Sequence, residues 1–173
     1  MIERIEWFKR RFTFDLPVWM FPNILERLRG TPGRIEERVA SINTERLINK
    51  SGIKWSIQEN IGHLLDLEPL WYGRVDDMLV GVPEMRPADL KNTKTHEANH
   101  NSKHLPEILS DFREARIKLV SRLEVLDERA VQRYSLHPRL KTKMRIIDLA
   151  FFVAEHDDHH LAAITERITD KSG

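Results

Sequence analysis

The chain has 173 residues, of which 40% are hydrophobic and 32% are charged, and its formal net charge is +1. This size and balance are typical of one soluble domain with a sizeable core, and the near-zero charge gives no overall field that would attract nucleic acid or an anionic membrane. The absence of cysteine excludes disulfides, thiolate metal sites and a cysteine nucleophile, and it fits a reducing cytoplasm. We therefore expect a single cytoplasmic domain over residues 1–173 that binds neither nucleic acid nor membrane.

The first 16 residues mix basic side chains with aromatic ones, namely Trp7, Phe8, Phe12 and Phe14. We expect residues 1–16 to form an arm or a short helix that lays these aromatic rings on the body of the domain. A nucleic-acid patch is disfavoured because acidic residues lie among the basic ones. The stretch also lacks the apolar run of a signal peptide, and the longest apolar run of the chain, residues 149–154, is far too short to span a bilayer.

A first helix is predicted over residues 18–43 from the spacing of its apolar side chains. Gly30 interrupts this pattern, and Pro32 suits the first position of a new helix. Thr31 would then be the N-cap of the restarted helix. We thus expect the first bundle helix to break at Gly30.

A second helix is predicted from Ser56 to about Val80. Ser56 is followed three residues later by Glu59, which is the pattern of a capping box. The next segment, residues 81–104, contains two prolines and little apolar periodicity, which predicts one long connection. Connections of that length often cover a functional site.

Two further helices complete the pattern, over residues 106–127 and 144–169. Residues 128–143 are read as a connection, and no segment shows the alternation expected of a strand. Four helices of this length predict an all-α four-helix bundle with its long connection between helices two and three.

Three histidines in two of these helices are candidate metal ligands. His156 and His160 are four residues apart on the inward face of the last helix, a spacing that stacks two imidazoles on one side. His63 lies two turns into the second helix. Together they offer three nitrogens to one divalent cation and leave a coordination position open, as in catalytic zinc sites, where bound water becomes a nucleophile. The alternative is that all three are polar residues hydrogen-bonded inside the bundle.

Several neighbouring side chains have competing interpretations. Glu59, one turn before His63, is a weak candidate for a catalytic base, and the capping role is preferred. His159 is read as lying outside the ligand set. Asp157 and Asp158 either orient the imidazoles or form a solvated acidic edge.

The remaining histidines are assigned no catalytic role. His96, His100 and His104 recur every four residues, but they lie in a predicted loop, so helical stacking does not apply and we expect no second metal site there. This loop is expected to lie over the first site. His137, which precedes Pro138, is read as an anchor of its loop.

The chain resembles the DinB/YfiT-like family of metalloenzymes. The resemblance is carried in order by WSIQENIGHL at residues 55–64, HPR at residues 137–139 and FFVAEHDDHH at residues 151–160. It covers nearly the whole chain and implies a four-helix bundle, a homodimer, and a nickel, zinc or similar ion held on three histidines. Carried over residue by residue, these are His63, His156 and His160.

One departure from the family pattern affects the ligand pair. Relatives that resemble bacillithiol transferases use a histidine pair one turn later, which would here be His159 with position 163. Ala163 cannot bind a metal. The pair must then be His156 with His160 or, as the weaker alternative, His156 with His159.

The resemblance implies a metal-dependent enzyme that acts on a small molecule. The two reaction types considered are thiol-dependent S-transfer, with a low-molecular-weight thiol such as bacillithiol or glutathione as cosubstrate, and metal-dependent hydrolysis. Three imidazoles suit zinc, nickel, copper and iron alike, and zinc and nickel are favoured here. The alternative from a different class is a non-catalytic bundle, in which a metal only staples the helices or a face pairs two chains.

Overall fold

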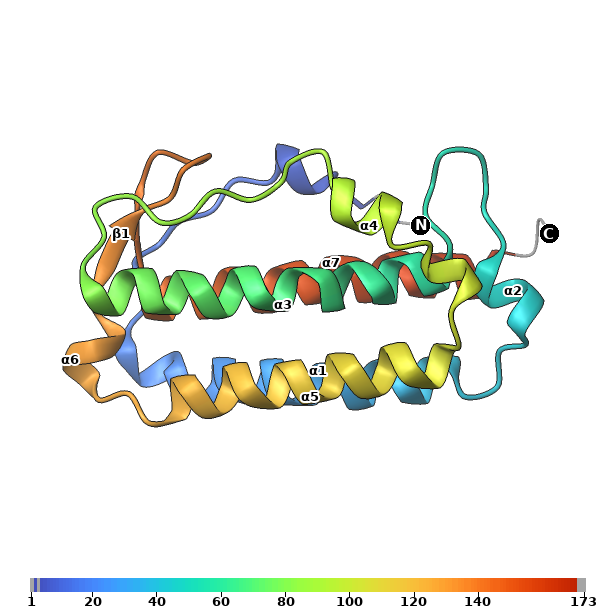
Figure 1. Ribbon diagram of the computed structural model, residues 1–173. Coiled ribbons are helices and arrows are strands. Elements are labelled where there is room, and N and C mark those ends of the chain that lie inside the picture. Colours follow the sequence, from blue (N-terminus) through green and yellow to red (C-terminus); the bar gives the residue numbers. More distant parts are fainter. Residues whose placement is uncertain (1, 3, 171–173) are drawn as a thin grey trace.

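The computed structural model describes Ile2 and residues 4–170, which form mainly long helices (Figure 1). The elements in chain order are η1 (Trp7–Lys9), η2 (Val18–Met20), α1 (Phe21–Val39), α2 (Thr44–Ile48), α3 (Ile57–Val80), α4 (Thr93–Glu97), η3 (His100–Ser102), α5 (Leu105–Glu124), α6 (Glu128–Val131), β1 (Tyr134–Leu136), β2 (Lys143–Arg145) and α7 (Ile146–Thr169). The long helices α1, α3, α5 and α7 form a four-helix bundle, which confirms the predicted fold class. None of the helices in the described part of the chain has both the length and the apolar character needed to cross a membrane.

The four long helices are arranged in two layers, with α3 and α7 in one and α1 and α5 in the other (Figure 1). Each helix also packs against one helix of the opposite layer, α3 on α5 and α1 on α7. Residues 4–16 of the N-terminal arm and the connection between α3 and α5 both run across the outer side of the α3–α7 layer (Figure 1). The long connection thus lies over the pair of helices that carry the candidate ligands.

Helix α1 is continuous, so the expected break at Gly30 is wrong. Pro32 lies inside the helix and has no N–H to donate to the carbonyl of Leu28. That carbonyl accepts a hydrogen bond from Arg116 Nη1 instead, at 3.2 Å. Thr31 is not an N-cap, because its hydroxyl bonds within the bundle, 2.8 Å from Asp157 Oδ2. Hydrogen bonds to residues distant in the sequence therefore allow α1 to continue through Gly30 and Pro32, which locally favour the end of a helix.

The connection after α5 contains a β-hairpin, which corrects the reading of that segment as strandless. Strands β1 and β2 pair antiparallel, with Ser135 opposite Met144, and β1 also bridges to Glu84 in the long connection. Each strand has only three residues, too few for an alternating pattern to be visible in the sequence. The hairpin fixes residues 137–139 beside the end of α3.

The predicted helix starts are otherwise close to the observed ones. Ser56 caps α3 as expected, because its hydroxyl accepts the Glu59 N–H at 3.0 Å and the Glu59 carboxylate accepts the Ser56 N–H at 2.8 Å. Helix α5 begins at Leu105 with Pro106 in its first turn. Helix α7 begins at Ile146, two residues after the predicted start.

The N-terminal arm packs its aromatic rings against α7, as predicted. The Trp7 ring lies 5.0 Å from the Phe152 ring and 4.9 Å from the His156 ring. Phe12 and Phe14 also contact the core, whereas Phe8 is 55% exposed. The arm thus brings a tryptophan to the candidate metal ligands.

The apolar core is divided into two clusters along the bundle axis. Between them lies a set of buried polar side chains, one from each long helix, which we term the polar layer: Thr31, Glu68, Arg116 and Asp157. The Arg116 guanidinium is 1% exposed and pairs with both Glu68 and Asp157. The polar layer therefore ties all four helices together at the level of the histidines.

Candidate metal centre

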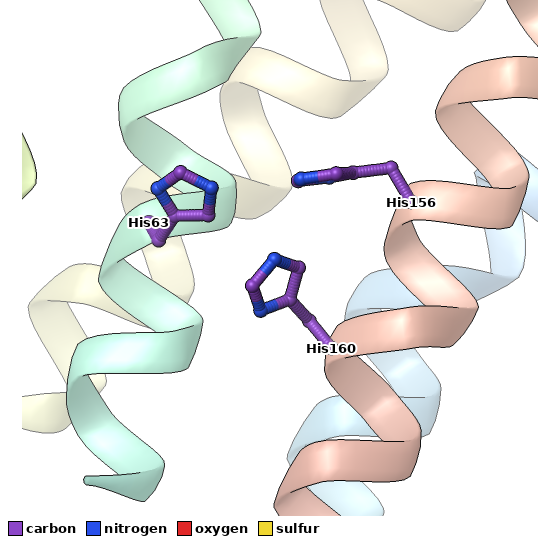
Figure 2. Close-up of side chains that lie close together, drawn as sticks. All are labelled: His63, His156 and His160. Atoms are coloured by element: carbon purple, nitrogen blue, oxygen red, sulfur yellow. The ribbon is translucent and has the colours of Figure 1, made fainter. Parts of the chain in front are cut away.

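Three buried imidazoles from α3 and α7 point toward one another (Figure 2). His63 comes from α3, and His156 and His160 come from successive turns of α7. One ring nitrogen of each lies within 4.8 Å of one nitrogen of the other two. The side chains are 4%, 4% and 7% exposed, respectively. Within the described residues, this is the group of histidine and acidic side chains spaced to hold an ion.

The proton of His63 is fixed by a chain of hydrogen bonds. Its Nδ1 lies 3.0 Å from Thr95 Oγ1, and that hydroxyl donates its single proton to Asp66 Oδ2 at 2.9 Å. The hydroxyl oxygen must therefore accept from His63, which places the ring proton on Nδ1. The Nε2 lone pair is left free to bind a metal, in the arrangement common for metal-binding histidines.

The proton of His160 is fixed in the same way by Asn60. His160 Nδ1 lies 2.8 Å from Asn60 Oδ1. The Asn60 amide nitrogen donates to the carbonyl of Ser56 at 2.8 Å, which orients the amide oxygen toward the imidazole. His160 therefore carries its proton on Nδ1 and presents an Nε2 lone pair.

The third imidazole, His156, has a buried nitrogen without a partner. Its Nδ1 makes no hydrogen bond to any described residue. The ring instead makes edge-to-face contacts with two tryptophans, with ring centroids 4.9 Å apart for Trp7 and 5.7 Å apart for Trp71. A polar ring in such surroundings is costly unless a ligand compensates it.

All three imidazoles are neutral at neutral pH. Burial lowers the pKa of His63 to about 4, against a smaller opposing effect of Asp66. Burial and the neighbouring imidazoles hold the pKa values of His156 and His160 well below 6.5. Three neutral nitrogens, two with defined lone pairs and one ring with an orphaned nitrogen, fit a divalent cation.

These low pKa values predict that the metal-free protein loses stability as the pH falls from about 6.5 to about 4. His63 titrates near pH 6.5 when unfolded and near pH 4 when folded. Between these values the unfolded chain binds more protons, so protonation favours unfolding, by up to ~1.4 kcal/mol per pH unit for each such histidine. Urea unfolding in the presence of EDTA measures this slope. A free energy of unfolding that stays constant across the window would contradict the prediction.

The acidic side chains that lie near the histidines in the sequence form contacts that stabilise the bundle. The carboxylate of Glu59 is engaged by the Ser56 N–H and by Lys50 Nζ at 2.9 Å, so we assign it no further role. The buried Asp157 belongs to the polar layer, and Asp158 pairs with arginines of α1. Neither aspartate bonds to an imidazole, so the idea that they orient the ligands is wrong.

His159 lies beside the three imidazoles and outside their group. Its Nε2 is 2.8 Å from Arg4 Nη1, and its ring is 5.6 Å from the Trp7 ring. Burial and the cation of Arg4 lower its pKa to about 4. His159 therefore links α7 to the N-terminal arm.

The sequence pattern did not reveal the partners that orient the ligands. Asn60, Asp66 and Thr95 carry no recognisable spacing, because Thr95 reaches His63 only through the fold of the long connection. His100 from the same connection bonds to Asp66 through Nε2, at 2.8 Å. A Cβ at Gly62 would lie 2.3 Å from the His100 ring, so only glycine leaves room for this contact. His96, His100 and His104 are not brought together into a group that could hold an ion.

A cavity of about 630 Å³ opens beside the three imidazoles. Its wall includes the rings of Trp55, Trp71 and Phe152, and Trp7 and Phe8 of the arm also line it. Small-molecule sites commonly have volumes of ~300–1,000 Å³, so the cavity can admit a small molecule to the imidazoles.

Comparisons with known proteins identify a family and solved structures to which the chain is similar. The model of the DinB superfamily matches residues 27–164. No curated protein matches the sequence significantly. A solved structure of YfiT from Bacillus subtilis, described as a probable metal-dependent hydrolase with an unusual four-helix bundle topology, is 19% identical with a TM-score of 0.81 over 91% of each chain. A mycothiol-dependent maleylpyruvate isomerase is 13% identical with a TM-score of 0.66, over 87% of this chain and 62% of that one.

Proposed function

The chain belongs to the DinB superfamily, and on that premise we propose that it is a metal-dependent enzyme with a divalent ion held by His63, His156 and His160. The observation that carries the proposal is the pair of fixed imidazole tautomers. Thr95 Oγ1 and Asn60 Oδ1 accept hydrogen bonds from the Nδ1–H groups of His63 and His160, so the Nε2 lone pairs of both rings are left for the shared space. A core histidine also needs a partner for its N–H, but free lone pairs that converge with a third buried imidazole are what a metal ion requires.

The site is built to leave room for a reacting molecule. A structural zinc site usually closes with a fourth protein ligand, whereas the candidate group in the described residues consists of three histidines and borders an open cavity. A bound zinc or nickel ion would supply Lewis acidity to a water or thiol at the open position. The protein's part is to hold the imidazoles neutral, fix their protons and exclude bulk water with Trp7, Trp55 and Trp71.

We propose thiol-dependent S-transfer to a small molecule as the first candidate reaction and hydrolysis as the second. Because the chain has no cysteine, a thiol nucleophile must come from a cosubstrate such as bacillithiol or glutathione. The cavity has room for a cosubstrate and a substrate of modest size. Hydrolysis is supported by the description of YfiT, and use of a small thiol by that of the mycothiol-dependent isomerase.

Cobalt-loaded protein offers a direct test of the proposed chemistry. We expect glutathione or bacillithiol to produce a thiolate-to-cobalt absorption band, and a panel of electrophiles and esters to show turnover that EDTA abolishes. His160→Ala should lose both signals, whereas His159→Gln, one residue away, should keep the cobalt spectrum. Stoichiometric cobalt binding with neither a thiol band nor turnover would favour the non-catalytic, metal-stapled bundle.

A cytoplasmic location and a homodimeric state complete the proposal. Both come from composition and family resemblance. Light scattering of the purified chain decides the oligomeric state, and a monomer would remove the dimer from the proposal.

A further inference from the structure

The cavity that contains the imidazoles also holds a buried arginine that is hydrogen-bonded to no described carboxylate. Arg74 of α3 is 1% exposed and lines the cavity wall. Its Nε donates to the carbonyl of Arg86 at 3.1 Å, and its Nη1 lies 3.2 Å from His137 Nε2. No described carboxylate bonds to it. Burial lowers its pKa to about 10, so the guanidinium remains charged at neutral pH.

A second buried arginine in the same bundle shows what such a charge normally requires. Arg116 is also 1% exposed, and two carboxylates, from Glu68 and Asp157, surround its guanidinium. Buried cations are almost always paired in this way. Arg74 is the exception, because no described carboxylate hydrogen-bonds to it. Asp77 attracts its charge but is hydrogen-bonded to Arg86, and the Arg74 side chain lines the cavity.

The contact between Arg74 and His137 joins two hydrogen-bond donors. His137 Nδ1 accepts the backbone N–H groups of Arg139 and Leu140, at 3.2 and 3.1 Å. A neutral imidazole has one proton, which must then lie on Nε2. Burial and the nearby arginines keep the ring neutral by lowering its pKa to about 3. His137 Nε2 and Arg74 Nη1, both donors, therefore lie 3.2 Å apart, and no described residue accepts a hydrogen bond from His137 Nε2–H.

Arg139, two residues after His137, adds a third unsatisfied donor. Its Nη2 is buried without a hydrogen-bond partner among the described residues. Its guanidinium stacks on the Phe8 ring, with Cζ 5.1 Å from the ring centre. Arg74, His137 and Arg139 all line the cavity shared with the imidazoles. The carboxylates of Asp89 and Glu166 on the same lining are engaged by backbone amides of residues 91 and 93 and by Arg4, respectively.

Two aromatic rings connect this cluster to the candidate metal centre. Arg74 Cζ lies 5.5 Å from the Trp71 ring, which is itself 5.7 Å from the His156 ring. The His137 ring lies 5.4 Å from the Phe152 ring, and Phe152 is one turn before His156 on α7. One small molecule with an apolar middle can therefore contact both ends.

We propose that Arg74, His137 and Arg139 form a subsite for an oxyanion, a carboxylate or phosphate, carried by the small-molecule substrate. The oxyanion accepts hydrogen bonds from all three side chains, and Trp71 and Phe152 pack against the apolar part of the molecule. The reacting end then reaches the three histidines, a step that rests on the proposed function. The substrate class is a small organic acid or phosphate ester with a short apolar spacer.

Binding of simple acids to the full chain tests this subsite. The protein is measured as purified and again after EDTA treatment. The probes are phenylacetate, phenyl phosphate and the neutral isostere phenylacetamide, followed by calorimetry and by tryptophan fluorescence, since Trp71 lies under Arg74. We expect the two anions to bind in both states and the amide not to bind. Arg139→Gln and Arg74→Gln should each weaken anion binding at least tenfold. Arg4→Gln is the matched control, because it removes a cavity arginine that is already paired with Glu166, and it should change little.

Three outcomes would overturn the proposal. One is that neither anion binds, and another is that both arginine variants bind as well as the native chain. The third is anion binding that is lost after EDTA treatment and is the same in the native chain and the arginine variants. That result would mean that the anion binds the metal ion. Within the first outcome, Arg74-dependent binding of glutathione or inorganic phosphate would assign the three side chains to the cosubstrate or to free anion instead of the substrate. Arg139→Gln alters a partly exposed loop residue, and circular dichroism verifies its fold. Because the subsite is tested without metal, its failure is separate from failure of the metal proposal.

Discussion

Replacing His160 with alanine is expected to lower the affinity for a divalent ion more than 100-fold, the largest effect on binding we predict. The variant removes one of the three proposed ligands, and His63 and His156 alone are too few to hold the ion. Loss of a residue that only orients a ligand typically costs ~10–100-fold, so Asn60→Ala should give an intermediate loss. The measurement is the metal content of untagged protein after dialysis against a competing chelator, with zinc and nickel compared.

The adjacent histidine provides the control for this experiment. His159→Ala should retain about one ion per chain, because His159 bonds to Arg4 and lies outside the group of three. Metal lost in His159→Ala and kept in His160→Ala would establish the alternative ligand pair. Native protein that takes up neither zinc nor nickel would mean that the imidazoles serve packing alone.

Replacing Arg116 with methionine is expected to lower the free energy of unfolding by about 3–5 kcal/mol, the largest effect on stability we predict. The methionine keeps most of the volume and removes the charge, leaving Glu68 and Asp157 buried without a cation. It also removes the donor to the Leu28 carbonyl that Pro32 cannot satisfy. Urea unfolding at neutral pH measures the loss.

Two comparisons make the Arg116 experiment specific. Arg113→Met removes an exposed arginine of the same helix, paired with Glu36, and should cost at most ~1 kcal/mol. The difference in unfolding free energy between the native chain and Arg116→Met should also become smaller as the pH falls. Burial raises the pKa of Glu68 and Arg116 opposes that rise. Without the guanidinium the pKa of Glu68 rises further, so the folded variant takes up a proton more readily than the native chain does. A loss below 1 kcal/mol would show that the polar layer contributes little to stability.

The polar layer and the metal centre are adjacent parts of one arrangement. Asp157 of the polar layer directly follows His156, and Glu68 is five residues after His63 on α3. Because α7 turns by about 100° per residue, Asp157 points into the bundle while His156 points toward the cavity. The ion pairs with Arg116 therefore hold α3 and α7 at a fixed separation where the imidazoles must meet.

What the sequence determined by itself is the part that depends on local spacing. Apolar residues at helical intervals specify the four long helices, and the Ser56–Glu59 pair specifies where α3 begins. The four-residue interval of His156 and His160 puts both rings on one face, so the candidate ligands were predictable, and His63 was added by its place on a facing helix. The helices, the start of α3 and the His156–His160 pair need only the geometry of one helix, whereas adding His63 also needs the expectation that two helices face each other.

What only the tertiary structure decided is the part that depends on contacts between distant residues. Helix α1 continues past Gly30 and Pro32 because Arg116, from α5, satisfies the Leu28 carbonyl. The proton on His63 is placed by Thr95, and the contact between Arg74 and His137 becomes evident only when the hairpin brings the two side chains together. Such contacts join residues about 30 to 90 positions apart. No periodicity encodes them, since they arise from which helices pack together and which buried polar groups find a partner there.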